Sequence, residues 1–324
     1  MILETDRLLL RPWKESDAEE CYRYARDPAV GPVTGWPAHQ SLEESRRIIR
    51  NVLSVPENYA LVWKETGLPV GSIGLRFAPA TDLTDRADEC ELGFWLGVPY
   101  WGRGIMTEAA REILRHAFMD LGAGTVWCGY YEGNERSRRV QEKCGFRYQY
   151  TITGKDVPLL GERRTEQVSC LTREEWQAGQ DRENLVERLL EMPYWIVDIL
   201  PAQVPAGAGG QYFSVEQYFL KPPRITAIRR KHAEILMRLG YDMAVSFDGG
   251  ESWEQNPDSE RLARKAEELT GSGFLRALFE PVEMMADLEP EETWMTVYNP
   301  CPVMLERLRK LAAEKGLFVW QPQP

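Results

Sequence analysis

Residues 92–104, which read L-G-F-W-L-G-V-P-Y-W-G-R-G, decide the fold of the first half of this chain. The first five letters are apolar, aromatic or glycine, a composition that suits a short buried strand. Pro99 ends that strand, because proline cannot donate a hydrogen bond to a sheet ladder. Gly102 and Gly104 form a turn that leads into I-M-T-E-A-A-R-E-I-L-R-H-A-F. The pattern therefore predicts a strand, a glycine-rich turn and a helix in succession.

Apolar residues after Gly104 recur at helical spacing along two adjoining stripes. These stripes are Ala109, Ile113, Ala117 and Leu121, and Ala110, Leu114 and Phe118. A glycine turn before an exposed helix N-terminus makes an anion site, since the backbone can approach a ligand and the first N–H groups lack helical partners. Taken alone, the glycine pair favours an ordinary strand-to-helix turn with glycines for packing.

A second motif spans residues 134–146 and reads N-E-R-S-R-R-V-Q-E-K-C-G-F. Asn134 suits the N-cap of a helix, and Ser137 follows three residues later. Such a start is common in helices of every function. Its interest lies in its position after the glycine turn, on a strand–helix–strand–helix pattern.

Both motifs resemble those of the GNAT superfamily of N-acetyltransferases, especially the branch that includes the ribosomal-protein N-terminal acetylases (RimJ/RimL-like). W-G-R-G-I-M-T-E-A, from Trp101, resembles its acyl-CoA loop, and residues 134–146 resemble its pattern N-x-x-S-x-x-V-x-x-K-x-G-F. The opening E-T-D-R-L-L-L-R-P and the later T-R-E-E-W are also typical of this branch. The resemblance covers residues 1–176. It implies a mixed α+β fold with a GNAT-type, largely antiparallel sheet flanked by helices.

The resemblance implies an acyltransferase that moves an acetyl group from acetyl-CoA, as cosubstrate, to a primary amine. Transfer would be direct, through a ternary complex. The acceptor could be a protein N-terminus or a small amine such as an antibiotic or a polyamine. A different hypothesis is an acyl-CoA-binding sensor without catalytic turnover.

The resemblance also implies which residues bind acetyl-CoA. The pyrophosphate would lie on the N–H groups of residues 101–106, and the pantetheine arm would lie on the backbone of the strand before them. Residues of the second motif would contact the remaining groups of acetyl-CoA. The expected residues are Leu96, Val98, Trp101, Gly102, Arg103, Gly104, Ile105, Met106, Asn134, Ser137, Arg138 and Lys143. Trp101 and Met106 depart from the family pattern Gln/Arg-x-x-Gly-x-Gly/Ala, which matters little where backbone donors bind. Arg103 could be solvated instead, and Arg138 and Lys143 could simply cover the helix face.

Ser137 and Glu91 are the expected catalytic residues. In the resembling branch the serine hydroxyl lies near the thioester sulfur, so Ser137 could hydrogen-bond the leaving thiolate. Glu91 lies on the central strand, where it could take the proton of the amine directly or through water. A carboxylate partly removed from water would have a raised pKa suited to this role. The alternative for Glu91 is a structural salt bridge. Direct transfer requires no covalent nucleophile, and no nucleophile with a basic partner is evident.

The acceptor side is expected to include a proline- and glycine-rich loop at residues 28–39. In the resembling family this region forms one wall of the acceptor site, which makes Trp36 and His39 candidate substrate contacts. The alternative is that Trp36 packs the loop down and that His39 is solvated. For His39 we favour the solvated alternative.

Composition limits the function of the whole chain. Its 324 residues carry a net charge of −11, which argues against nucleic acid as a partner and suits an amine-bearing substrate. The six cysteines have no C-x-x-C pair and no histidine spacing for zinc, so no metal is expected. Reduced thiols, no membrane-length apolar run and no signal peptide predict a cytoplasmic protein without membrane contact.

Three parts are expected: an acetyltransferase domain at 1–177, a linker or junction helix at 178–192, and a second α+β domain at 193–324. The second domain is expected to have strands at 195–200, 212–220, 243–247, 274–279, 293–298 and 317–320, and helices at 225–239, 259–269 and 303–314. It contains no recognisable family motif. We expect it to shape the acceptor site or to build a homodimer.

Overall fold

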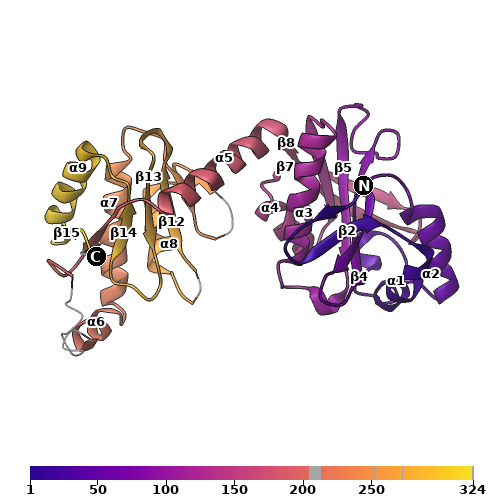
Figure 1. Ribbon diagram of the computed structural model, residues 1–324, viewed down its shortest axis with the longest axis horizontal. Helices are drawn as coiled ribbons and strands as arrows, with labels where there is room; N and C mark the ends of the chain where they lie inside the picture. Colours follow the sequence, from indigo (N-terminus) through magenta and orange to yellow (C-terminus); the bar gives the residue numbers. More distant parts are fainter. Residues whose placement is uncertain (204–212, 251–252, 272, 323–324) are drawn as a thin grey trace. The chain divides into compact units, whose positions relative to one another are not determined.

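A computed structural model of the chain describes residues 1–203, 213–250, 253–271 and 273–322 (Figure 1). The chain divides into two compact units, Met1–Gln177 and Ala178–Pro324. Each unit contains its own sheet, and the predicted mixed α+β class is confirmed. The division falls within helix α5 (Arg173–Leu190), so most of the predicted linker is helical. Within the described ranges, no helix combines the length and apolarity needed to cross a membrane.

The first unit has an eight-stranded sheet in the order β1-β2-β3-β4-β5-β6-β8-β7. Its strands are β1 (Leu3–Glu4), β2 (Leu8–Pro12), β3 (Asn58–Trp63), β4 (Leu68–Phe77), β5 (Glu89–Leu96), β6 (Thr125–Tyr131), β7 (Arg147–Val157) and β8 (Glu162–Thr172). Its helices are α1 (Ala18–Ala25), α2 (Leu42–Ile48), α3 (Ile105–Arg115) and α4 (Glu135–Lys143). Short helical segments are η1 (Glu15–Asp17), η2 (Pro32–Thr34), η3 (Ile49–Leu53), η4 (Val98–Tyr100) and η5 (His116–Asp120).

Alternation along the strands places helices on both faces of this sheet, because successive side chains of a strand point to opposite faces. Leu8 and Leu10 of β2 join the core that packs against α3 and α4. Leu9, between them, joins the other core, with α1 and α2. Figure 1 shows the two helix pairs on opposite sides of the strands.

Strands β5 and β6 are the only parallel neighbours among the described strands of this sheet. Helix α3 connects them, since parallel strands need a crossover. Their pairing covers only residues 89–91 of β5 and 125–127 of β6. Strand β5 continues to Leu96 and β6 to Tyr131. The two strands therefore separate beyond Glu91 and leave a wedge open to ligands.

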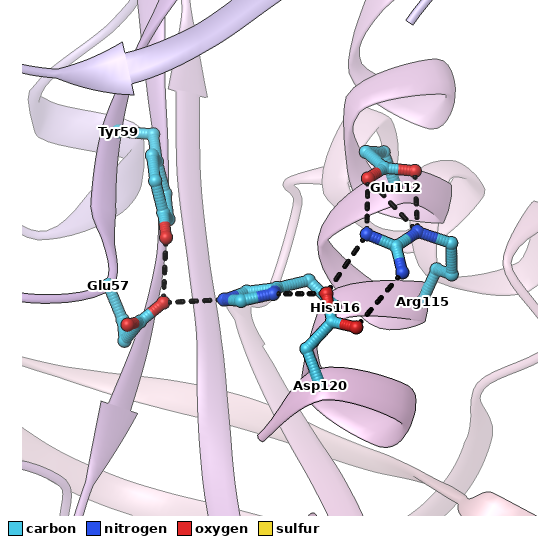
Figure 2. A network of polar contacts seen from close by, with 6 residues as sticks. All are labelled: Glu57, Tyr59, Glu112, Arg115, His116 and Asp120. Carbon is cyan, nitrogen blue, oxygen red and sulfur yellow. Dashed lines mark hydrogen bonds and ion pairs between the residues drawn. The ribbon is translucent and has the colours of Figure 1, made fainter. Parts of the chain in front are cut away.

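The buried His116 links η5, the segment that follows α3, to the beginning of β3 (Figure 2). The ring of His116, which is 0% exposed, has Nε2 2.8 Å from Glu57 Oε2 and Nδ1 2.8 Å from Asp120 Oδ2. The Tyr59 hydroxyl also donates to Glu57 Oε2, at 2.7 Å. Carboxylate oxygens therefore lie within hydrogen-bond distance of both ring nitrogens. The complete network comprises Glu57, Tyr59, Glu112, Arg115, His116 and Asp120.

The second unit has a seven-stranded sheet in the order β11-β10-β12-β13-β14-β9-β15, and every described pair in it is antiparallel. Its strands are β9 (Tyr194–Asp198), β10 (Ser246–Asp248), β11 (Trp253–Gln255), β12 (Leu275–Phe279), β13 (Met284–Leu288), β14 (Met295–Tyr298) and β15 (Phe318–Trp320). Its further helices are α6 (Phe213–Phe219), α7 (Arg224–Leu239), α8 (Ser259–Glu267) and α9 (Pro302–Glu314), and η6 (Glu280–Val282) follows β12. Helices α7, α8 and α9 contribute to one core, and Val186 and Leu189 of α5 to another.

The predicted strand at 212–220 is wrong, because residues 213–219 form helix α6. Tyr212 itself lies outside the described residues. Val215, Tyr218 and Phe219 recur at spacings of three and four, which suit a helix as well as the aromatic alternation suits a strand. The guanidinium of Arg224 lies 3.6 Å from the Tyr218 ring centre, a contact with α7 that no local pattern predicts.

The sequence analysis did not predict strand β13, although it pairs with both β12 and β14. Its five residues, M-M-A-D-L, include alanine and aspartate, which are depleted in strands. All five are nevertheless buried. Burial between two neighbouring strands therefore outweighs the weak local preference.

Candidate active site

The wedge between β5 and β6 opens into two cavities. The smaller, of about 410 Å³, lies beside the glycine turn and the starts of α3 and α4. The larger, of about 740 Å³, lies beside β5, β6, the β7–β8 hairpin and the loop before α2. Residues that line both are Val33, Thr34, Phe94, Trp95, Asn134 and Ser137. The two cavities therefore meet at the beginning of α4.

The glycine turn has the geometry of an anion site. Gly102 and Gly104 have φ of +72° and +73°, in the left-handed region that glycine adopts without steric cost. Gly104 is the N-cap of α3, and the first N–H groups of that helix have no intrahelical acceptor. Arg7 holds the turn, because its Nη1 donates to the Arg103 carbonyl oxygen at 2.9 Å and its Nε to Glu108 at 2.6 Å. The turn is therefore preorganised for phosphate oxygens.

Most of the residues predicted to bind acetyl-CoA line the smaller cavity. They are Leu96, Trp101, Gly102, Gly104, Ile105, Met106, Asn134, Ser137 and Lys143. Val98, Arg103 and Arg138 are not among its lining residues. The N–H of Trp101 donates to the Val98 carbonyl oxygen at 3.1 Å, so it is already used within the turn.

The structure places Arg103 away from the smaller cavity. Its guanidinium lies 5.0 Å from the Trp63 ring centre and 5.7 Å from that of Tyr100. Arginine stacks readily on aromatic faces, and these contacts hold the side chain against the sheet. Only the backbone of Arg103 therefore remains part of the glycine turn.

Arginines other than the predicted Arg138 line the smaller cavity. Arg138 pairs with Glu135 and Glu142 along the helix surface. The cavity is lined instead by one face of α4, comprising Arg136, Arg139, Val140 and Lys143. These positions are spaced by three, four and seven residues, so helical periodicity could have identified them. This face offers three cations to the phosphates of a ligand.

The edge of β5 facing the wedge offers main-chain groups. The N–H of Gly97 donates to the Val70 carbonyl oxygen of β4 at 2.8 Å. Because successive residues of a strand direct their main-chain groups to opposite edges, those of Phe94 and Leu96 face the wedge. The Trp101 indole already donates to the Leu96 carbonyl oxygen, at 2.8 Å. Phe94, which the sequence analysis did not single out, therefore joins Leu96 as a contact for an extended ligand.

Ser137 lies where the two cavities meet, and it is 9% exposed. Asn134 Oδ1 accepts the Ser137 N–H at 3.3 Å, as predicted for an N-cap. The Ser137 Oγ accepts a hydrogen bond from Gln141 Nε2 at 3.3 Å. Since a hydroxyl can accept and donate together, the Ser137 O–H is left to donate towards the cavities.

Glu91 lines the larger cavity and is 8% exposed. Its Oε1 forms an ion pair with Arg76, and its Oε2 accepts from the Thr81 hydroxyl at 2.6 Å. Both oxygens are therefore engaged within the protein. This geometry matches the structural salt bridge that the sequence left as the alternative.

A second carboxylate, Glu166 of β8, lines the same cavity and was not identified from the sequence. It is 7% exposed, and its Oε2 accepts from Lys155 Nζ at 2.5 Å. Within the described part of the chain, no hydrogen bond reaches its Oε1. Burial raises the pKa of Glu166 above its ordinary value, and the Glu91 charge adds to the rise while Lys155 opposes it. A Cβ on Gly129 would lie 2.6 Å from Oε1, so the glycine leaves room for this carboxylate.

Trp36 and His39 both line the larger cavity. The expectation that His39 is solvated is wrong, because the ring is 6% exposed and its Nδ1 lies 2.8 Å from Ser45 Oγ. Burial lowers the pKa of His39. The Trp36 ring lies 5.2 Å from the His39 ring and 5.9 Å from that of Trp95. These contacts bury His39 within the loop and leave Trp36 on the cavity wall.

A covalent mechanism through a cysteine thiolate has no support at the wedge. Cys128 lies beside the wedge, but burial holds its pKa well above the ordinary thiol value, which opposes formation of a thiolate nucleophile. Among the described residues, no group of three or more His, Cys, Asp or Glu side chains is placed to hold a metal ion.

Comparison with known proteins agrees with this geometry. The model of the family described as the acetyltransferase (GNAT) domain matches residues 7–147. The FsC-acetyl coenzyme A-N(2)-transacetylase of Aspergillus fumigatus is 31% identical over 181 residues, which span 54% of this chain and 77% of that protein. The chain belongs to the GNAT acetyltransferase family. It is therefore an acyltransferase, and the family implies acetyl-CoA as its cosubstrate.

Two further proteins are similar to part of the chain. The uncharacterized N-acetyltransferase YoaA of Bacillus subtilis is 26% identical over 150 residues, spanning 45% of this chain and 82% of that protein. The ribosomal-protein-S5-alanine acetyltransferase structure from Vibrio fischeri has 18% identity and a TM-score of 0.44, and the match covers 54% of this chain and 98% of that one.

Proposed function

We propose that this GNAT protein transfers the acetyl group of acetyl-CoA directly to a primary amine within a ternary complex. The observation that carries the proposal is the position of Ser137, which lies on the shared wall of two cavities. One cavity has the donors and cations for CoA, and the other has carboxylates for an amine. The two substrates would meet at Ser137 without a covalent enzyme intermediate.

The smaller cavity suits acetyl-CoA on the structure's own features. Left-handed glycines and the α3 N-terminus offer N–H groups to the pyrophosphate, and Arg136, Arg139 and Lys143 offer positive charge. The main-chain groups of Phe94 and Leu96 would hold the pantetheine arm in the wedge. The resemblance of the motifs at 101–109 and 134–146 to the ribosomal-protein acetylase branch supports assignment of the chain to that branch. They concern the CoA side and carry no information about the acceptor.

In the reaction, the amine nitrogen forms a bond with the acetyl carbon as the carbon–sulfur bond breaks. Glu166 would take the proton that the amine loses and later release it to solvent. Ser137 would donate a hydrogen bond to the sulfur, which leaves as a thiolate and is protonated from solvent. The protein thus supplies orientation, one base and one hydrogen-bond donor.

Glu166 is a better candidate for the base than Glu91, which the sequence favoured. Arg76 and Thr81 engage both oxygens of Glu91, whereas Glu166 has one engaged oxygen and a raised pKa. Glu91 then acts through Glu166, because its charge raises the pKa of that carboxyl. Glu91 remains the alternative base.

For the second unit we propose either acceptor recognition or formation of a homodimer, with parts at 1–177, 178–192 and 193–324 as expected from the sequence. Tyr241 and Val303 are 88% and 73% exposed, and we propose them as contact residues of this unit. Sedimentation of the intact protein, and of Tyr241→Ser and Val303→Ser variants, tests the dimer. If the intact protein is a monomer at all concentrations, acceptor recognition remains as the proposed role of the second unit.

The proposed function is tested by release of CoA thiol from acetyl-CoA with a panel of amines and peptides, alongside calorimetric measurement of acetyl-CoA binding. Amine-dependent thiol release with saturation by both substrates is the expected result. Tight binding of acetyl-CoA with no turnover of any acceptor would favour the acyl-CoA sensor. Absence of binding would overturn the proposal.

A further inference from the structure

We propose that the acceptor is a primary amine carried on an apolar body, such as an alkyl or arylalkyl group, and that a compact polycation is a poor substrate. This inference rests on the proposed function and concerns the larger cavity alone. Its volume of about 740 Å³ is in the range of sites that bind small organic molecules.

Exposed apolar side chains line the larger cavity beside the exposed charged side chains of Arg47, Asp82 and Asp156. Val33, Val52 and Leu159 line it and are 37%, 57% and 71% exposed. Single exposed apolar side chains are ordinary on protein surfaces. These three, however, come from η2, η3 and the turn after β7, and they converge on one cavity. Contact with an apolar ligand would remove all three from water, which is favourable.

The walls of the same cavity are aromatic. They are formed by Trp36, Phe94, Trp95, Tyr130 and Tyr131. Aromatic faces bind alkyl and aryl groups, and they also attract an ammonium ion before it loses its proton. The apolar lining therefore extends from the mouth to Ser137.

The carboxylates of the cavity outnumber their partner cations by one. Its carboxylates form ion pairs as Glu91–Arg76, Glu166–Lys155, Asp82–Lys155, Asp156–Arg163 and Glu44–Arg47. Glu166 and Asp82 share Lys155, so these five carboxylates face four cations, and the one excess negative charge suits a single ammonium group. A second ammonium group would find no further uncompensated carboxylate among these residues and would be repelled by Lys155, whose burial strengthens the repulsion. A single amine, with the rest of the molecule apolar, avoids this cost.

The test measures kcat/KM of the intact protein by thiol release for matched amines. Hexylamine and 2-phenylethylamine are the apolar members, and putrescine and spermidine are the polycations. Two short peptides, one beginning with phenylalanine and one with lysine, test an N-terminal amine as the source of the same chemistry. The apolar member of each set is expected to react with kcat/KM at least roughly 10-fold higher, which corresponds to burial of about two methylene groups.

The variants Leu159→Ser and Val52→Ser test whether the rim is responsible. Each is expected to raise KM for the apolar amines roughly 3- to 10-fold, with kcat and acetyl-CoA affinity unchanged, because the rim is remote from the reacting atoms. Leu68→Ser is the matched control, since Leu68 is 43% exposed on β4 and lines neither cavity.

The outcomes separate the inference from the proposed function. Preference for polycations, or rim variants that behave like Leu68→Ser, would overturn the apolar acceptor while leaving the acetyltransferase intact. Binding of acetyl-CoA without turnover of any amine would overturn it together with catalysis. A higher rate for the apolar peptide than for the free apolar amines would support the inference and identify peptide N-termini as the source.

Discussion

Strands β5 and β6 of the first unit run parallel and separate after three residue pairs, whereas every described strand pair of the second unit is antiparallel. In the second unit the pairs β12–β13 and β13–β14 continue over most of each strand, and their backbone groups bond to each other. In the first unit the separated strands leave backbone groups and side chains exposed to a ligand. The site therefore arises where the hydrogen bonding between two neighbouring strands, β5 and β6, ends.

Removal of the proposed base should have the largest effect. Glu166→Gln is expected to lower kcat roughly 10²- to 10⁴-fold, the usual contribution of a general base, with acetyl-CoA affinity retained. Steady-state thiol release and calorimetry measure the two quantities. Glu91→Gln is the comparison variant and should have the smaller effect. If Glu91→Gln is the more damaging substitution, Glu91 is the base.

The pH dependence of the wild-type protein gives a second test of Glu166. Its raised pKa means that the carboxyl stays protonated, and inactive as a base, up to a higher pH than an ordinary glutamate does. The kcat/KM of the intact enzyme should therefore fall as pH decreases through a pKa above 4.5. The Glu166→Gln variant should lack this acid limb. If the variant shows the same decrease of kcat/KM at low pH, a group other than Glu166 is responsible for that decrease.

Strain in the glycine turn should weaken binding of acetyl-CoA. Gly104→Val places a β-branched residue at φ +73°, which should reduce affinity up to roughly 100-fold by displacing the N–H donors. Gly161→Val is a matched control, because Gly161 has φ +66°, lies in the β7–β8 turn and has an open Cβ position. Calorimetry should show a normal affinity for this control. Equal losses in the two variants would mean that general destabilisation, rather than the turn, is responsible.

Loss of the Ser137 hydroxyl should have a smaller catalytic effect. Ser137→Ala is expected to lower kcat roughly 10- to 100-fold, because the leaving thiolate loses one hydrogen bond. The Asn134 cap to the Ser137 backbone remains, so acetyl-CoA affinity should be almost unchanged. The free energy of unfolding should fall by about 1–3 kcal/mol, because the buried Gln141 Nε2 loses its acceptor. A normal kcat would show that Ser137 serves only the start of α4.

The buried histidine should affect stability more than catalysis. His116→Ala is expected to lower the free energy of unfolding by about 2–4 kcal/mol, since it leaves a cavity and removes the partner of Glu57. The hydrogen bond from His116 is the main cause of the lowered pKa of Asp120. The stabilisation that follows from this lowered pKa is present above pH 3.8, and it is lost as pH falls through the pKa of the folded protein. In the variant this acid-dependent loss of stability should therefore be smaller. Arg115→Gln, a change at an exposed ion pair, is the control and should cost less than about 1 kcal/mol.

The sequence was most informative where one local segment carries several constraints. The glycine turn, the N-cap Asn134 and the position of Ser137 all follow from neighbouring residues, and the structure has them as predicted. By contrast, Glu166 faces the wedge only because the β7–β8 hairpin returns β8 beside β6. No local pattern connects it with Glu91. The same limit explains β13, whose strand character depends on its two neighbours.

Opening of the β5–β6 pair also has a thermodynamic consequence. In the free protein, the wedge leaves main-chain groups of β5 without a neighbouring strand in the interior of the sheet. An extended pantetheine arm would bind these groups in place of that strand. Ligand that binds only the folded form stabilises it by about 2.7 kcal/mol at a concentration of 100 Kd. Acetyl-CoA should thus raise the melting temperature of the first unit alone. The melting temperature of the second unit, whose described neighbouring strands stay hydrogen-bonded to each other, should be unchanged. The substrate would then be a structural component of one sheet.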